Sequence, residues 1–145
     1  VIADEPTPSL DVTVQAAYLA LLKELQQKTD LAILFITHDF GVVARMCDRV
    51  AVMYAGRVVE TASTWELFDE PAHPYSEALL RSVPDVRMGT TRLTFIDGQP
   101  PSIYEIPKGC PFASRCQYVM PHCREEFPPK TVVGERHEVS CWRYE

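Results

Sequence analysis

The sequence lacks a long hydrophobic run. None of its 145 residues falls in a stretch that approaches the roughly 18 consecutive apolar residues that a membrane-spanning helix needs. It also lacks a basic segment followed by an apolar one and a cleavage site, which is the pattern of an export signal. We therefore expect a chain that neither crosses a bilayer nor is exported.

An excess of basic residues is missing as well. The chain has 14 Lys and Arg against 20 Asp and Glu, which gives a formal net charge of -6. Residues 1–84 hold 6 basic and 12 acidic residues, and residues 85–145 hold 8 of each. Binding to a phosphate backbone needs a basic stripe, and neither part offers one. The sequence therefore predicts no nucleic-acid partner.

Apolar segments alternate with helical patterns in residues 1–84. Residues 1–3 and 31–36 are continuous apolar runs, typical of strands that are covered on both faces. Between them, residues 12 to about 28 have helical periodicity with Asp11 as N-cap, and residues 39–46 predict a short helix. This order predicts an α/β fold with a mainly parallel sheet.

The next segment predicts a hairpin and two short helices. Residues 49–60 indicate two strands around a tight turn at Ala55 and Gly56. Ser63 and Glu66 have the spacing of a capping box, and Pro74 suits the first turn of a further helix. Residues 85–94 are a candidate linker. We predict one domain at 1–84 and a second at 85–145.

The residues from 96 to 145, called the tail below, are rich in proline and cysteine and have little periodic apolar sequence. Such a segment cannot build a large core alone. A metal or a covalent cross-link could supply the missing stability.

Two carboxylates and a histidine follow the first two predicted strands. Asp4 and Glu5 end the first strand, and His38 lies just beyond the second. In an α/β sheet the carboxyl ends of adjacent strands share one edge, where ligands bind. There, Asp4 could hold Mg²⁺ through water, Glu5 could activate a water, and His38 could reach a terminal phosphate. Acidic turn residues and a helix-capping histidine are the alternative interpretation.

The same residues resemble the ATPase subunits of ABC transporters. VIADEP at 1–6 resembles the Walker B segment, PSLD at 8–11 the D-loop, and ITHD at 36–39 the switch-histidine loop. The resemblance implies that Asp4 is the Mg²⁺-associated carboxylate, Glu5 the catalytic base and His38 the switch histidine. It also implies that a partner ATPase subunit is faced by Ser9, Leu10 and Asp11.

Three elements that precede Walker B in that family do not occur in these residues. They are the GxxxxGK[ST] phosphate loop, the LSGGQ-like signature and the Q-loop. We therefore expect the sequence to be the C-terminal part of a longer P-loop ATPase. We also expect these residues alone neither to bind ATP well nor to hydrolyse it.

Four cysteines gather in the tail with the spacing Cys110-x5-Cys116-x6-Cys123-x17-Cys141. Four thiolates can hold zinc or an iron–sulfur cluster. Structural zinc usually shows cysteine pairs two to four residues apart, so the wide spacing favours a cluster, while free thiols and disulfides stay open. His122 and His137 could replace one ligand, but we expect both to be unengaged on the surface.

A second resemblance covers the tail. HPYSEALL at 73–80, the segment 97–123 and HEVSCW at 137–142 resemble the C-terminal extension of oligopeptide/dipeptide permease ATPases. In some members of that family the four cysteines ligate a [4Fe–4S] cluster. The resemblance implies the same ligand set here, with zinc as the alternative metal: Cys110, Cys116, Cys123 and Cys141.

Together the resemblances imply an ATP-binding and ATP-hydrolysing subunit of an ABC importer for oligopeptides or dipeptides, with ATP and Mg²⁺ as its ligands. Its implied partners are a second ATPase subunit in a head-to-tail dimer, transmembrane permease subunits and, indirectly, a substrate-binding protein. The implied location is cytoplasmic, on the inner face of the cell membrane. The alternatives are a metal-binding regulatory or interaction module, and an ABC ATPase that serves a sugar or metal-complex importer. The residues do not report the transported substrate.

Overall fold

The structure, a computed structural model, describes residues 1–83, 95–102 and 104–145. It forms two compact units, Val1–Asp48 and Arg49–Glu145. The boundary that we predict after residue 84 and the linker at 85–94 lie outside the described residues, so that division stays a prediction. Among the described residues, no helix has both the length and the apolar character that membrane crossing requires.

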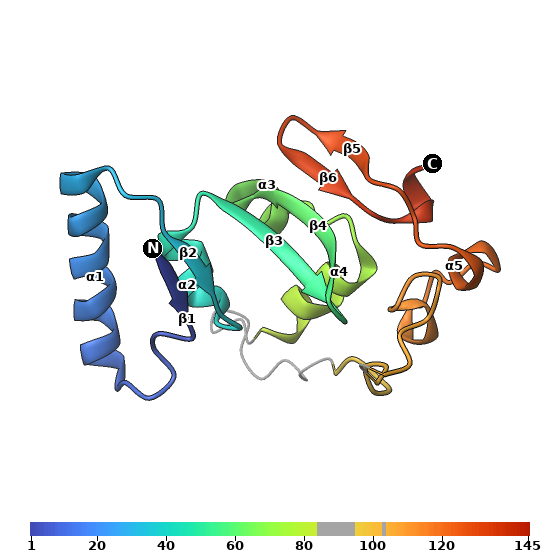
Figure 1. Ribbon diagram of the computed structural model, residues 1–145, viewed down its shortest axis with the longest axis horizontal. Helices are drawn as coiled ribbons and strands as arrows, with labels where there is room; N and C mark the ends of the chain where they lie inside the picture. Colours follow the sequence, from blue (N-terminus) through green and yellow to red (C-terminus); the bar gives the residue numbers. More distant parts are fainter. Residues whose placement is uncertain (84–94, 103) are drawn as a thin grey trace. The chain divides into compact units, whose positions relative to one another are not determined.

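The first unit contains the expected strand–helix–strand order. It comprises β1 (Ile2–Asp4), α1 (Val12–Thr29), β2 (Leu34–Ile36) and α2 (Phe40–Met46). Strands β1 and β2 pair in parallel, with Ile2 opposite Leu34 and Asp4 opposite Ile36 (Figure 1). The parallel pairing predicted for this part of the chain is confirmed. It brings the carboxyl ends of both strands to one edge.

Aspartates begin both helices of the first unit. The Asp11 carboxylate accepts hydrogen bonds from the backbone N–H groups of Thr13 and Val14, both at 3.0 Å, as predicted for the N-cap of α1. The Asp39 carboxylate accepts from the backbone of Gly41 at 2.7 Å at the start of α2. Each carboxylate satisfies amide groups that have no partner inside the helix.

The second unit is built on one sheet of four strands. Its elements are β3 (Arg49–Tyr54), β4 (Arg57–Ser63), α3 (Thr64–Asp69), α4 (Pro74–Ser82), α5 (His122–Glu125), β5 (Thr131–Gly134) and β6 (His137–Val139), with short 3-10 turns at Ala113–Arg115 and Trp142–Tyr144. The strand order is β3-β4-β6-β5, and every neighbouring pair is antiparallel (Figure 1).

This sheet corrects the prediction of a mainly parallel sheet. The molecule is a mixed α/β fold, but the larger of the two sheets that the described residues form is antiparallel. Two of the three pairings, β3–β4 and β5–β6, are hairpins, and the tight turn in each reverses the chain; the third, β4–β6, joins the two hairpins over a long distance in the sequence. Ala55 and Gly56, with φ of 46° and 76°, form the first of these turns, as predicted.

The predicted helix starts in this unit are also confirmed. Ser63 and Glu66 form a capping box at the start of α3, and Pro74 is in the first turn of α4. A serine oxygen and a glutamate carboxylate thus satisfy the first amide groups of α3 from both sides.

One hydrophobic core joins the tail to the sheet. Val59 and Ala62 of β4 and Leu67 of α3 are buried in the same cluster as Phe112 of the tail. The Phe112 ring also packs edge-on against Tyr54, with ring centroids 5.2 Å apart. Burying a side chain such as Leu67 or Phe112 contributes about 1.5–3 kcal/mol each. The tail therefore gains stability by completing the core of β3 and β4.

Candidate functional site

Glu5 and His38 meet at the carboxyl edge of the parallel strands. His38 Nδ1 lies 2.8 Å from Glu5 Oε1, within hydrogen-bond distance. The Glu5 backbone N–H donates to the Ile36 carbonyl oxygen at 2.8 Å, which extends the β1–β2 pairing by one residue. The two strands thus bring together side chains 33 positions apart in the chain.

The Glu5 backbone has an unusual conformation. Its φ of 42° lies in the left-handed region, where residues other than glycine are uncommon. Such a conformation costs on the order of 1–3 kcal/mol, and residues of this kind concentrate at functional sites. The turn directs the Glu5 carboxylate towards His38 at the point where the strand ends.

The Glu5 carboxylate changes the acidity of His38. Its hydrogen bond and its negative charge raise the pKa of the His38 imidazole above the usual 6.5. The His38 side chain is 80% exposed and that of Glu5 40% exposed, so solvent reaches both groups. An open pair of a carboxylate and an imidazole can orient a water or receive a phosphate.

The other residues predicted for this edge lie nearby in the chain. Asp4 is the exposed last residue of β1. Ser9 is exposed within a turn in which the Leu10 N–H donates to the Thr7 carbonyl oxygen at 3.0 Å. The Asp11 carboxylate caps α1. The roles implied for Asp4, Ser9 and Asp11 stay predictions.

The four tail cysteines line one small cavity in the second unit. The cavity, called the thiol cavity below, has a volume of about 20 Å³, which is room for a small occupant. Its other lining residues include His73, Phe112, Trp142 and Arg143. No three ligand side chains of the described residues stand close enough together to hold one metal ion. The four thiols therefore line the same cavity, but they are not close enough together to bind a single metal ion.

Close backbone contacts fix two of these cysteines. The Cys110 N–H donates to the Cys123 carbonyl oxygen at 2.8 Å. A Cβ atom on Gly109 would lie 2.3 Å from that same oxygen and 2.7 Å from the Arg124 carbonyl carbon. Only glycine allows this approach, so Gly109 is required for the spacing of Cys110 and Cys123.

Burial affects the protonation of the thiols. It raises the pKa of Cys110 to about 11, and it raises the pKa values of Cys116 and Cys141 as well. None of the five cysteines, all of which lie within the described residues, forms a disulfide. Since thiols bind metals as thiolates, any metal that enters the thiol cavity must displace protons.

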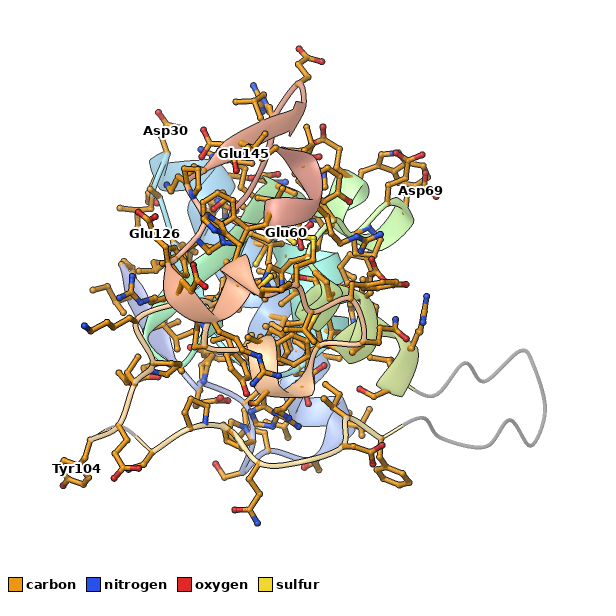
Figure 2. All side chains as sticks on the ribbon, turned by 90° about the vertical axis from the view of Figure 1, so that its right-hand side faces the viewer. Asp30, Glu60, Asp69, Tyr104, Glu126 and Glu145 are labelled. Carbon is orange, nitrogen blue, oxygen red and sulfur yellow. The ribbon has the colours of Figure 1, made fainter. Side chains whose placement is uncertain are left out.

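A buried polar network adjoins the thiol cavity. The Glu60 carboxylate, on a residue only 1% exposed, accepts hydrogen bonds from the backbone N–H groups of Ala72 at 2.8 Å and His73 at 2.9 Å. His137 Nε2 lies 2.6 Å from Glu60 Oε1. Figure 2 shows Glu60 in the interior of the second unit, whereas Tyr104 extends outwards. A buried charge of this kind is tolerated because three N–H groups surround it.

This network corrects the prediction that His137 is an unengaged surface residue. His137 is buried and bonded to Glu60, while His122 has an exposed side chain near Glu125. Sequence reasoning also missed His73, which is buried and lines the thiol cavity. The available signal was its place just before Pro74, where a polar side chain can cap a helix.

A positive charge also borders the thiol cavity. Arg143 Nη1 lies 2.9 Å from a carboxylate oxygen of Glu77, and the Arg143 guanidinium stands 4.0 Å from the ring centroid of Tyr118. Its charge works against the effect of burial on the pKa values of Cys116 and Cys141. It therefore favours thiolates in this part of the molecule.

Residues 59–123 match the family model described as the C-terminal region of oligopeptide/dipeptide transporters. The chain is 50% identical over 141 residues to the dipeptide transport ATP-binding protein DppD of Bacillus subtilis, covering 97% of the chain and 42% of that protein. It is 51% identical over 142 residues to the oligopeptide transport ATP-binding protein OppD of the same organism, covering 97% of the chain and 40% of that protein.

A further relative is the oligopeptide transport ATP-binding protein OppD of Haemophilus influenzae. It is 45% identical over 142 residues, covering 97% of the chain and 43% of that protein. The chain thus spans less than half the length of the curated relatives that it matches.

Proposed function

Because this chain belongs to the oligopeptide/dipeptide transporter family, we propose that it is part of the ATP-hydrolysing subunit of an ABC importer for oligopeptides or dipeptides. The names of its relatives support this, since they are peptide transport ATP-binding proteins. The proposed ligands of the whole protein are ATP and Mg²⁺.

The observation that carries this proposal is the contact between Glu5 and His38, 2.8 Å apart at the edge of β1 and β2. In phosphoryl transfer the protein mainly positions groups and stabilises charge. The Glu5 carboxylate accepts a proton from the attacking water, and His38 holds that carboxylate in place. A protonated His38 also complements the negative charge of the terminal phosphate.

The remaining residues of this edge have supporting roles in the proposal. Asp4 holds Mg²⁺ through water, and a bound Mg²⁺ neutralises phosphate charge. Ser9, Leu10 and Asp11 face a second ATPase subunit in a head-to-tail dimer. The dimer drives transmembrane permease subunits from the inner, cytoplasmic face of the membrane, and a substrate-binding protein delivers the peptide to them.

These 145 residues include no GxxxxGK[ST] loop, whose backbone amides and lysine would hold the phosphates. We therefore propose that they do not suffice for ATP binding or hydrolysis. The test uses a longer protein that contains this chain together with its phosphate loop. There, Glu5→Gln should lower ATP turnover by about 100-fold or more, because it removes a general base.

The matched control is Glu24→Gln, which neutralises an exposed carboxylate on α1 that pairs with Lys28. It should leave turnover unchanged. ATP turnover that survives Glu5→Gln would overturn the role of Glu5. Glu5-dependent turnover by the 145 residues alone would overturn the proposal that they are insufficient.

We further propose that Cys110, Cys116, Cys123 and Cys141 ligate a [4Fe–4S] cluster; the zinc alternative is not supported, because no three ligand side chains of the described residues are close enough to hold one ion. The support is that all four line the thiol cavity, and thiolates are the ligands that such clusters take. The cavity volume of about 20 Å³ is the space of about one water molecule, so the binding of a cluster would move its walls apart. A cluster has an iron at each of four corners, so it holds its thiolates farther apart than one ion does. Anaerobic purification with iron, sulfide and zinc analysis tests this, and stoichiometric zinc without iron would refute the cluster.

A further inference from the structure

Among the described residues that line the thiol cavity, His73 is the one histidine. It directly precedes α4 and is only 1% exposed. Its ring centroid lies 6.0 Å from that of Phe112, another lining residue. An imidazole in this position can ligate a metal, donate a hydrogen bond into the cavity or only pack against neighbouring side chains.

The hydrogen bond at the start of α4 fixes the tautomer of His73. The Tyr75 backbone N–H donates to His73 Nδ1 at 3.0 Å. Because Nδ1 accepts, the hydrogen of the neutral ring is on Nε2. The same hydrogen bond disfavours the protonated ring, because a hydrogen on Nδ1 would face the Tyr75 N–H. The ring therefore offers an N–H group at Nε2 and no free lone pair.

This tautomer argues against metal ligation. A histidine that binds a metal through Nε2 must carry its proton on Nδ1. In His73 that proton would point at the Tyr75 N–H, so ligation would break the cap of α4. Donation from Nε2 keeps the cap intact.

The ring is also held firmly. The His73 backbone N–H donates to the Glu60 carboxylate at 2.9 Å, and Glu60 is bonded in turn to His137. Pro74 restricts the backbone on the other side. Two other lining residues have polar hydrogens engaged elsewhere: Trp142 Nε1 donates to the Glu126 carbonyl oxygen, and Arg143 is paired with Glu77.

We propose that His73 donates its Nε2–H to a sulfur atom of the cluster that the four cysteines hold, and thereby raises the reduction potential of that cluster. This inference rests on the proposed [4Fe–4S] cluster. A hydrogen bond to sulfur stabilises the more negative, reduced form, which is one way that proteins tune such clusters.

Two substitutions separate this role from a purely structural one. His73→Asn keeps a side chain that can cap α4, but its amide is too short to reach where Nε2 lies. His73→Gln provides an amide N–H with a longer reach. His122→Asn is the control, because His122 is an exposed tail histidine that is not among the residues that line the cavity.

The experiment uses the longest available form of the protein, purified without oxygen. Iron and sulfide are quantified first, and the midpoint potential is then measured by a redox titration followed by electron paramagnetic resonance. We expect equal iron in all variants, a more negative potential in His73→Asn, a partial return in His73→Gln and no shift in His122→Asn.

Three other outcomes would each refute one part of the proposal: the hydrogen bond, the donor role or the cluster. An unchanged potential in His73→Asn with full iron refutes the hydrogen bond while leaving the cluster in place. Loss of iron from His73→Asn refutes a donor role and indicates a ligand or scaffold. Wild-type protein without iron and sulfide refutes the cluster itself, and this inference with it.

Discussion

Replacing Gly109 with alanine adds one methyl group, and we expect this substitution to destabilise the second unit strongly. The added Cβ would lie 2.3 Å from the Cys123 carbonyl oxygen and 2.7 Å from the Arg124 carbonyl carbon. Both are backbone atoms, so no side chain can rotate to make room. Relief requires that the Cys110 segment and α5 separate.

The cost can be estimated from two terms. Forcing an extra methyl group into a packed site costs about 1–3 kcal/mol. Separation also weakens the hydrogen bond from Cys110 to Cys123, now 2.8 Å long, which contributes about 0.5–1.5 kcal/mol. We therefore expect Gly109→Ala to lower the free energy of unfolding by about 2–4 kcal/mol.

Gly56→Ala is the matched control. Gly56 has a φ of 76°, but a Cβ there would meet nothing within 4 Å. Its cost is confined to the left-handed backbone, about 1–2 kcal/mol. Comparing the two variants separates steric overlap from backbone strain.

Urea unfolding measures the difference. The chain has 2 tryptophans, and Trp142 is part of the tail, where its Nε1 donates to the Glu126 carbonyl oxygen. In a Trp65→Phe background, Trp142 fluorescence follows the region that Gly109→Ala disturbs. With unchanged slopes, the shift in midpoint gives the change in stability. If Gly109→Ala costs no more than Gly56→Ala, the steric account of this close approach is wrong.

Three further predictions concern polar contacts. Glu5 raises the pKa of His38 above 6.5, so the ion pair stabilises the fold fully below pH 6.5, and this stabilisation is lost as the pH rises through the raised pKa of His38. In Glu5→Gln, the pKa of His38 measured by NMR should return towards 6.5. Ser63→Ala should cost about 1 kcal/mol in urea unfolding, since it removes the capping box of α3. Glu60→Gln should cost about 3–5 kcal/mol, because one amide oxygen cannot replace a carboxylate that accepts three bonds, and an unchanged urea midpoint would contradict this.

Local features of the fold could be predicted from the sequence. Asp11, the turn at Ala55 and Gly56, and the capping box at Ser63 and Glu66 each follow from hydrogen bonds or dihedral angles within four residues. The meeting of Glu5 and His38 could also be predicted. Parallel strands separated by one helix bring their carboxyl ends to one edge of the sheet. Recognising the two strands and the residues that follow them was therefore enough to predict this contact.

The pairing of β4 with β6 could not be predicted in the same way. Glu60 of β4 lies opposite Val139 of β6. These strands are far apart in the sequence, and local sequence patterns do not indicate which distant strands pair. For the same reason, the burial of His73 and His137 was missed. A histidine close to cysteines in the sequence, such as His137, suggests a surface or a metal site, and only the position of the Glu60 carboxylate shows why its ring lies inside. The same carboxylate accepts a hydrogen bond from the backbone N–H of His73, which is buried beside it.

The distance along the chain between Glu60 and His137 has a consequence for synthesis. The two residues are 77 positions apart, and ribosomes add about 5–20 residues per second. For roughly 4–15 s after Glu60 is made, β4 therefore lacks the strand that will cover its edge, and the carboxylate lacks its histidine. An uncovered edge strand invites pairing with other chains, and a charge on it is a known protection. Glu60 serves in the finished protein as the centre of a buried network, and in the growing chain it can keep β4 solvated until β6 arrives.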